Sequence, residues 1–136
     1  PRMVRPVIGL RTPRQPVPGL ALAGRVVALG AGVTGITLGD RVAGTATGAF
    51  AEYAVASATK LAIIPDGVSM TDAAAAPVSY ATALQTVQDA ARVQPGQRVL
   101  VIGAGGGVGA AVVQFAKRAG AEVTAVASAR KRAFVE

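Results

Sequence analysis

Six consecutive residues from Ala104 to Gly109, AGGGVG, combine small side chains with a spacing that suits phosphate binding. A pyrophosphate must approach backbone N–H groups at the start of a helix, and a Cβ at Gly106 or Gly109 would obstruct that approach or the packing of the helix on its strand. The run matches A-x-G-x-x-G, the dinucleotide fingerprint with alanine in place of the first glycine. The residues that we expect to wrap the pyrophosphate are Ala104, Gly105, Gly106, Gly107, Val108 and Gly109.

The residues on either side of this turn predict a strand before it and a helix after it. Val99–Ile102 is a continuous apolar run, as in a parallel strand buried on both faces. Lys117 and Arg118 suit the last turn of a helix, and Gly120 suits its end. This order favours a nucleotide site over a flexible glycine-rich loop, and the lack of a following Gly-Lys-Ser/Thr excludes a P-loop. The apolar face of the helix is expected at Val108, Ala111, Val112, Phe115, Ala116 and Ala119.

The end of the next predicted strand, residues 122–127, indicates which dinucleotide binds. An NAD site places Asp or Glu there to hold the ribose 2′-OH, whereas this chain has Ala127 followed by SARKR. A hydroxyl group and cations would instead bind a 2′-phosphate. We therefore predict NADPH as the cofactor, with Ser128, Arg130 and Lys131 facing its 2′-phosphate. The alternative is that residues 130–132 form only the solvated start of a helix.

Composition excludes several other classes of site. The chain of 136 residues contains neither Cys nor His, so it offers no ordinary zinc ligand and no His-based acid–base or Cys nucleophilic catalysis. We expect no metal site.

The net charge of +7 lies at the two ends, because residues 15–116 carry five basic and five acidic groups. With only 4% aromatic residues, a nucleic-acid partner is not expected. No apolar run approaches the roughly 18 residues of a membrane helix, and the prolines before Gly19 argue against a signal peptide. We expect a cytoplasmic protein without a membrane partner.

The first half of the chain predicts a compact antiparallel β unit followed by helices. Residues 1–18 are rich in Pro and Arg and predict an extended arm. We expect a helix capped by Thr71 and interrupted at Pro77, a second helix over 78–91, and a turn at 94–97 that leads into the glycine-turn strand. The expected strands cover 25–29, 39–43, 48–55 and 60–64.

Four segments of the chain, taken in order, resemble the medium-chain dehydrogenase/reductase superfamily. They are GRVVALGAGVTGITLGDRV, GAFAEYAV, IPDGVSMTDAAAAPVSYATAL and VQPGQRVLVIGAGGGVGAAVVQFAKRAGAEVTAVAS. The chain is most similar to its zinc-independent quinone-oxidoreductase-like and alcohol-dehydrogenase-like members. The resemblance implies an α/β protein, with a partial GroES-like antiparallel β domain followed by the first β-α-β unit of a Rossmann doubly wound parallel sheet. We expect the β domain over 1–68, connecting helices over 69–93 and the first half of the NADP-binding domain over 94–136. Such a chain would be truncated at both ends.

The resemblance also implies an activity: hydride transfer from NADPH to a small-molecule quinone, enone or carbonyl substrate. Thr82 matches a threonine near the nicotinamide, and Tyr53 and Phe50 match positions near the cleft, with Tyr53 the weak catalytic candidate. For Tyr53 and Phe50, ordinary strand packing is the alternative. The alternative function is a non-catalytic NADPH-binding or interaction protein on the same fold, or an inactive fragment. Relatives often form homodimers, which we expect only of a full-length form.

Overall fold

The computed structural model describes residues 16–135, so most of the predicted N-terminal arm lies outside the described residues. The chain divides into two compact units, Pro1–Pro77 and Val78–Glu136, and each is described by itself below. The predicted domain boundaries after residues 68 and 93 stay predictions.

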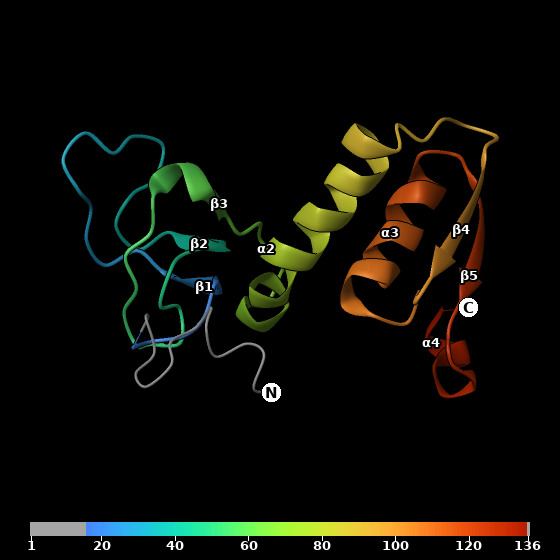
Figure 1. Cartoon of the computed structure of the whole chain (residues 1–136). Helices are drawn as coiled ribbons and strands as arrows, with labels where there is room; N and C mark the ends of the chain where they lie inside the picture. Colours follow the sequence, from blue (N-terminus) through green and yellow to red (C-terminus); the bar gives the residue numbers. More distant parts are fainter. Residues whose placement is uncertain (1–15, 136) are drawn as a thin grey trace. The chain divides into compact units, whose positions relative to one another are not determined.

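Unit 1 contains an antiparallel three-stranded sheet in the order β1-β2-β3 (Figure 1). Its strands are β1 (Ala21–Arg25), β2 (Arg41–Thr45) and β3 (Leu61–Ile63), with the 3-10 helix η2 (Ala58–Lys60) just before β3. Gly24 pairs with Val42, and Val42 in turn with Ile63. The buried residues of this small core are Val42 in β2, Ala46 just after β2 and Ile64 just after β3.

Two strand predictions in unit 1 need correction. The strand expected at 25–29 lies earlier in the chain, at Ala21–Arg25. The last backbone hydrogen bonds on this side of the sheet are those of Val26 with Gly39 and Asp40 (2.8 and 3.0 Å), and a glycine-rich loop follows. The segment 48–55 forms no strand. Its Phe50 N–H donates to the Pro18 carbonyl at 2.9 Å, away from any ladder, and residues 51–55 are exposed.

A single helix, α2 (Met70–Leu84), replaces the two helices that the sequence predicted, and the π-helix η3 (Gln85–Ala90) continues from it. Pro77 removes one helical N–H, but the alanines before it favour the helix enough for it to continue. The cap is Ser69 and not Thr71. The Ser69 Oγ accepts from the Asp72 N–H at 3.0 Å and donates to Asp72 Oδ2 at 2.6 Å.

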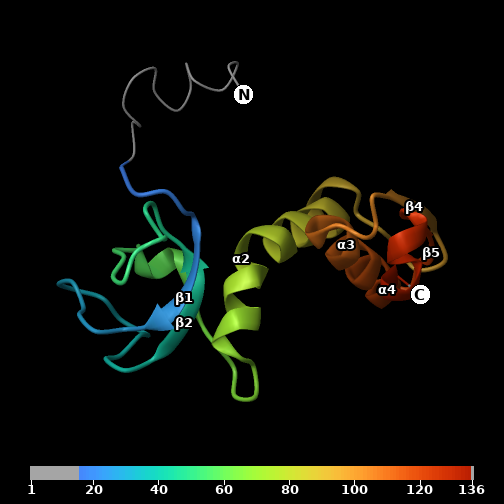
Figure 2. The same cartoon turned by 90° about the horizontal axis from the view of Figure 1, so that it is seen from below.

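Unit 2 contains the strand, helix and strand that the glycine pattern predicted. β4 (Arg98–Ile102) and β5 (Glu122–Val126) pair in parallel, with Val101 beside Ala125, and α3 (Gly107–Arg118) packs along them (Figure 2). The 3-10 helix η4 (Ala129–Lys131) and the short α4 (Arg132–Val135) follow. Gly120 has a φ of +84°, as expected of the residue that ends α3.

The core of unit 2 lies between α3 and the parallel pair. Val101, Ala104 and Val113 form its buried centre, and Val113 is a core residue that the predicted helix face omitted. The prediction that β4 is buried on both faces is wrong in this structure. Leu100 and Ile102 are 61% and 78% exposed, because α3 covers only the face that carries Val101.

No helix within residues 16–135 is long and apolar enough to span a membrane.

Candidate functional site

The glycine turn follows β4 directly and is tied to β5 by backbone hydrogen bonds. The N–H groups of Gly103 and Ala104 both donate to the carbonyl of Val126 at the end of β5, at 2.9 and 3.0 Å. The Gly106 N–H then donates to the Gly103 carbonyl at 2.9 Å, which closes the turn. The start of the turn is packed into the core, since Ala104 is fully buried, whereas Gly106 and Gly107 are exposed.

The first turn of α3 presents an exposed, positively polarised backbone. Gly106 is the N-cap in extended conformation, and no acidic residue lies in the first turn. The first N–H groups of an α-helix have no carbonyl partner within the helix, and the helix dipole adds positive potential there. This arrangement suits an anion such as a pyrophosphate.

Two of the glycines have close neighbours that crowd the position of a Cβ. A Cβ on Gly109 would lie 2.9 Å from the carbonyl carbon of Gly103 and 3.0 Å from the Cα of Ala104, so helix and turn could not approach as they do. A Cβ on Gly107 would lie 3.1 Å from the Oγ of Ser79 on α2. Ser79 is therefore a neighbour of the glycine turn that the sequence pattern did not reveal. Its spacing three residues before Thr82 places both on one side of α2.

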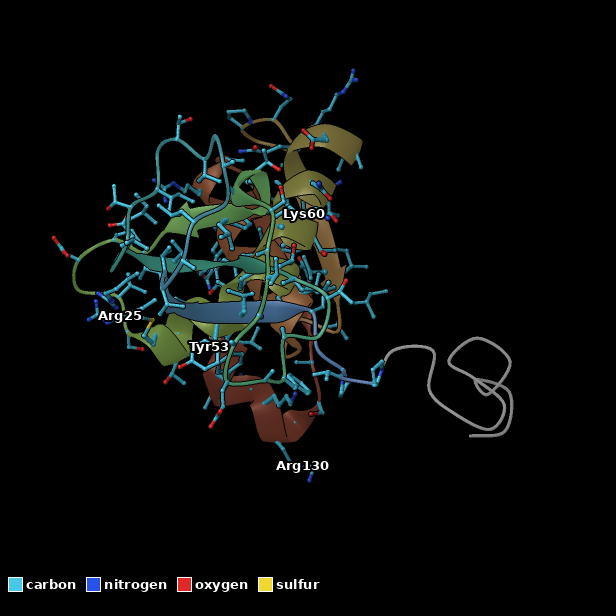
Figure 3. The ribbon with its side chains drawn as sticks, turned by 90° about the vertical axis from the view of Figure 1, so that its left-hand side faces the viewer. Arg25, Tyr53, Lys60 and Arg130 are labelled. Atoms are coloured by element: carbon cyan, nitrogen blue, oxygen red, sulfur yellow. The ribbon has the colours of Figure 1, made fainter. Side chains whose placement is uncertain are left out.

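The residues predicted to face a 2′-phosphate follow β5 directly. Ser128 is the N-cap of η4, and its carbonyl accepts from the Lys131 N–H at 2.8 Å. The Lys131 side chain reaches back to the glycine turn, where its Nζ donates to the Gly105 carbonyl at 2.7 Å. Arg130 projects away from the ribbon (Figure 3). The structure thus brings Lys131, but not Arg130, into contact with the turn.

The remaining predicted residues are placed as follows. Thr82 is exposed on α2, and its Oγ1 donates to the Val78 carbonyl of its own helix at 2.8 Å. Phe50 and Tyr53 are exposed residues of unit 1, and no hydroxyl contact of Tyr53 is observed within the described residues. Figure 3 labels Tyr53 near β1.

Unit 1 contains an open hollow of about 1090 Å³ beside β1. Apolar side chains line much of it, including Leu22, Val26 and Leu61, while Arg25, Glu52 and Tyr53 contribute polar groups. Ser57 and Thr59, just beyond its edge, share a hydroxyl hydrogen bond of 2.8 Å. Across residues 16–135 no three His, Cys, Asp or Glu side chains gather as a metal-binding group.

Comparisons with known proteins cover both halves of the chain. The alcohol dehydrogenase GroES-like domain family matches residues 3–66. Polyketide synthase GfsB of Streptomyces halstedii is 50% identical over 109 residues, which is 80% of this chain and 2% of that protein. Quinone oxidoreductase-like protein 2 of Mus musculus is 43% identical over 100 residues, which is 73% of this chain and 29% of that protein.

Solved structures extend the likeness through unit 2. An alcohol dehydrogenase superfamily protein from Novosphingobium aromaticivorans matches with a TM-score of 0.83 and 36% identity, over 96% of this chain and 41% of its own. The CurK enoyl reductase matches with a TM-score of 0.86 and 33% identity, over 98% and 41%. Mycobacterial Rv1454c, solved in complex with NADPH, matches with a TM-score of 0.80 and 36% identity, over 86% and 38%. The chain therefore spans about two fifths of these structures.

Proposed function

The chain belongs to the medium-chain dehydrogenase/reductase superfamily, and from that membership we propose that it acts in an NADPH-dependent, zinc-independent reductase. The substrate that we propose is a conjugated carbonyl compound or a quinone. The observation that carries the proposal is the contact between Lys131 and the glycine turn. It puts a cation for the 2′-phosphate next to the backbone that would hold the pyrophosphate.

The turn supplies the binding half of the mechanism. The exposed N–H groups at the start of α3 would bind the pyrophosphate, and the buried Ala104 fixes their position. Lys131 and Ser128 would hold the 2′-phosphate by a charge-assisted and a hydroxyl hydrogen bond. Arg130, which projects outward, would contribute longer-range attraction to the same group.

Bound NADPH supplies the hydride, that is, a proton with an electron pair. An enone could accept that hydride at its carbon–carbon double bond: the hydride's electron pair would form the new C–H bond, the π electrons of the double bond would shift toward the carbonyl, and the carbonyl oxygen would carry the negative charge until a donor or water protonated the product. Because conjugation spreads the negative charge, the protein mainly has to position donor and acceptor. A chain without Cys or His can support that chemistry, since it needs neither a zinc ligand nor an imidazole.

Relatives support this class of substrate. CurK is described as an enoyl reductase, and other matched proteins are described as polyketide synthases or quinone oxidoreductases. Enones, enoyl thioesters and quinones share the conjugated carbonyl that accepts a hydride. We propose Tyr53 as a proton or hydrogen-bond donor to the acceptor oxygen, because it is one of the polar residues that line the hollow of unit 1.

The proposal is tested by following NADPH oxidation at 340 nm in the protein as its gene encodes it. The acceptors would be an enone, an enoyl thioester and a benzoquinone. We expect oxidation in a one-to-one ratio with reduced product for at least one acceptor, unchanged after dialysis against a zinc chelator. NADPH binding without oxidation by any acceptor would favour a non-catalytic NADPH-binding protein. Zinc-dependent turnover would contradict the zinc-independent mechanism.

A further inference from the structure

Lys131 lies across Gly105, a position that the dinucleotide fingerprint leaves free to be any residue. A Cβ built on Gly105 would meet three atoms first, and all of them belong to Lys131: Cδ at 2.6 Å, Cβ at 3.0 Å and Cγ at 3.4 Å. The ammonium of the same side chain is 2.7 Å from the Gly105 carbonyl oxygen. Gly105 therefore admits the stem of Lys131 and also accepts its hydrogen bond.

Both ends of this contact are held by the backbone. The turn is fixed by the two hydrogen bonds to the Val126 carbonyl, and Lys131 is fixed by its N–H on the Ser128 carbonyl. Only two residues, Ala127 and Ser128, separate β5 from η4. The backbone of Lys131 is therefore held close to the end of β5 and to the glycine turn. We conclude that the local fold sets the position of its side chain over Gly105.

We propose that Gly105 and Lys131 form a strap that selects NADPH against NADH, an inference that rests on the proposed function. The strap is the Lys131 stem over Gly105 together with the ammonium on the Gly105 carbonyl. A 2′-phosphate offers the ammonium a fully charged partner and draws it off the turn. NADH has only a hydroxyl group there, so its binding must compete with the closed strap and receives no such replacement.

This mechanism differs from that of a lysine that only binds phosphate. A simple phosphate ligand strengthens NADPH binding and leaves NADH binding as it is. A strap also weakens NADH binding, because the binding-competent open form is only a fraction of the population. The affinity for NADH therefore separates the two roles.

The test measures the dissociation constants of NADPH and NADH by titration calorimetry in the protein as its gene encodes it. The first variant is Gly105→Ala. Gly105 does not have a left-handed φ, so the backbone accepts alanine, and the new Cβ displaces the lysine stem while leaving its ammonium free for a phosphate. We expect NADH to bind about five- to tenfold more tightly and NADPH to gain by a similar factor, because both dinucleotides are then spared the cost of opening the strap.

The second variant is Lys131→Met, which keeps an apolar stem but removes the ammonium. We expect NADPH to bind at least about tenfold more weakly and NADH several-fold more tightly. Lys117→Met, near the other end of α3, removes the same charge away from the turn and should change neither affinity appreciably.

Unchanged NADH affinity in both Gly105→Ala and Lys131→Met, with weaker NADPH binding in the latter, would overturn the strap and leave Lys131 as a phosphate ligand. Binding of neither dinucleotide by the unsubstituted protein would overturn the proposed function and the strap with it. Thermal unfolding of each variant shows whether an affinity change arises from a folded protein.

Discussion

The Oγ of Ser79 lies 3.1 Å from the point where a Cβ on Gly107 would stand, so a serine of α2 packs directly against the first turn of α3. This packing leaves no room for a larger residue at 107 unless the hydroxyl moves. Tyr80, the next residue on α2, stacks edge-to-face on Phe115 of α3 with ring centroids 6.0 Å apart. The part of α2 that belongs to unit 2 is thus in contact with α3, and each contact can be tested by substitution.

Gly107→Ala should destabilise the protein by about 1 kcal/mol, because the new methyl group crowds the Ser79 hydroxyl. In the Ser79→Ala background that crowding is gone, since the Ser79 Cβ would be at an ordinary 3.8 Å from the new methyl group. There the same change should be stabilising by about 0.5–1 kcal/mol, as alanine is a better helix residue than glycine. Urea unfolding of the two single variants and the double variant measures this difference. Equal effects of Gly107→Ala in both backgrounds would contradict the contact.

Gly109→Ala should destabilise the protein by about 1–3 kcal/mol, because its Cβ meets the backbone of Gly103 and Ala104, which cannot rotate away. It should also weaken dinucleotide binding by shifting the turn. Gly24→Ala in β1 is the matched control, since nothing lies within 4 Å of its Cβ position. The midpoints of denaturant unfolding of the two variants give this difference in stability. A Gly109→Ala variant as stable as Gly24→Ala would contradict the close approach of Gly109 to the backbone of the turn.

Ser69→Ala should lower stability by about 1 kcal/mol, because it removes the hydroxyl that accepts from the Asp72 N–H and leaves the start of α2 uncapped. Thr71→Ala tests the position that the sequence pattern favoured and should change stability by less than about 0.5 kcal/mol. Helix content and the unfolding midpoint are the measurements. A larger loss in Thr71→Ala than in Ser69→Ala would reverse the assignment of the cap.

Ser128→Asp should reduce the preference for NADPH over NADH by at least about tenfold, because a carboxylate at the end of β5 repels a 2′-phosphate and can accept from a ribose hydroxyl. Ser128→Ala is the control, in which only a hydroxyl hydrogen bond is lost and the preference should fall by a few-fold. The ratio of the two dissociation constants is the readout. An unchanged ratio in Ser128→Asp would place the 2′-phosphate elsewhere.

The sequence predicts the second unit better than the first for a physical reason. Val99–Ile102, the glycines and the apolar positions of α3 are consecutive local signals that agree with one another, and the structure confirms the strand, turn, helix and second strand. In unit 1 the signals conflict with tertiary contacts. The run GAFAEYAV alternates like a strand, yet Phe50 gives its N–H to Pro18, a partner that no local pattern reveals.

In the candidate site, too, the sequence predicts the features that local signals determine and misses those that tertiary contacts determine. The turn from Ala104 to Gly109 follows from spacing alone, since Gly106 and Gly109, the two glycines that the pattern requires, face the backbone of the turn itself. The contact between Lys131 and Gly105 does not, because it joins residues that are 26 positions apart. Ser79 was missed because a serine in a helix carries no signal of the glycine that it faces. Similarly, Thr71 and Ser69 both suit an N-cap, and only the hydrogen bond to Asp72 distinguishes them.

The measurement that tests the central claim most directly is the binding of NADPH itself. The protein as its gene encodes it would be titrated with NADPH and, separately, with NADH, and the bound fraction followed by cofactor fluorescence. We expect saturable one-to-one binding of NADPH, displaced by NADP⁺ at concentrations at which NAD⁺ has little effect. Absence of saturable binding, or tighter binding of NADH than of NADPH, would contradict this expectation.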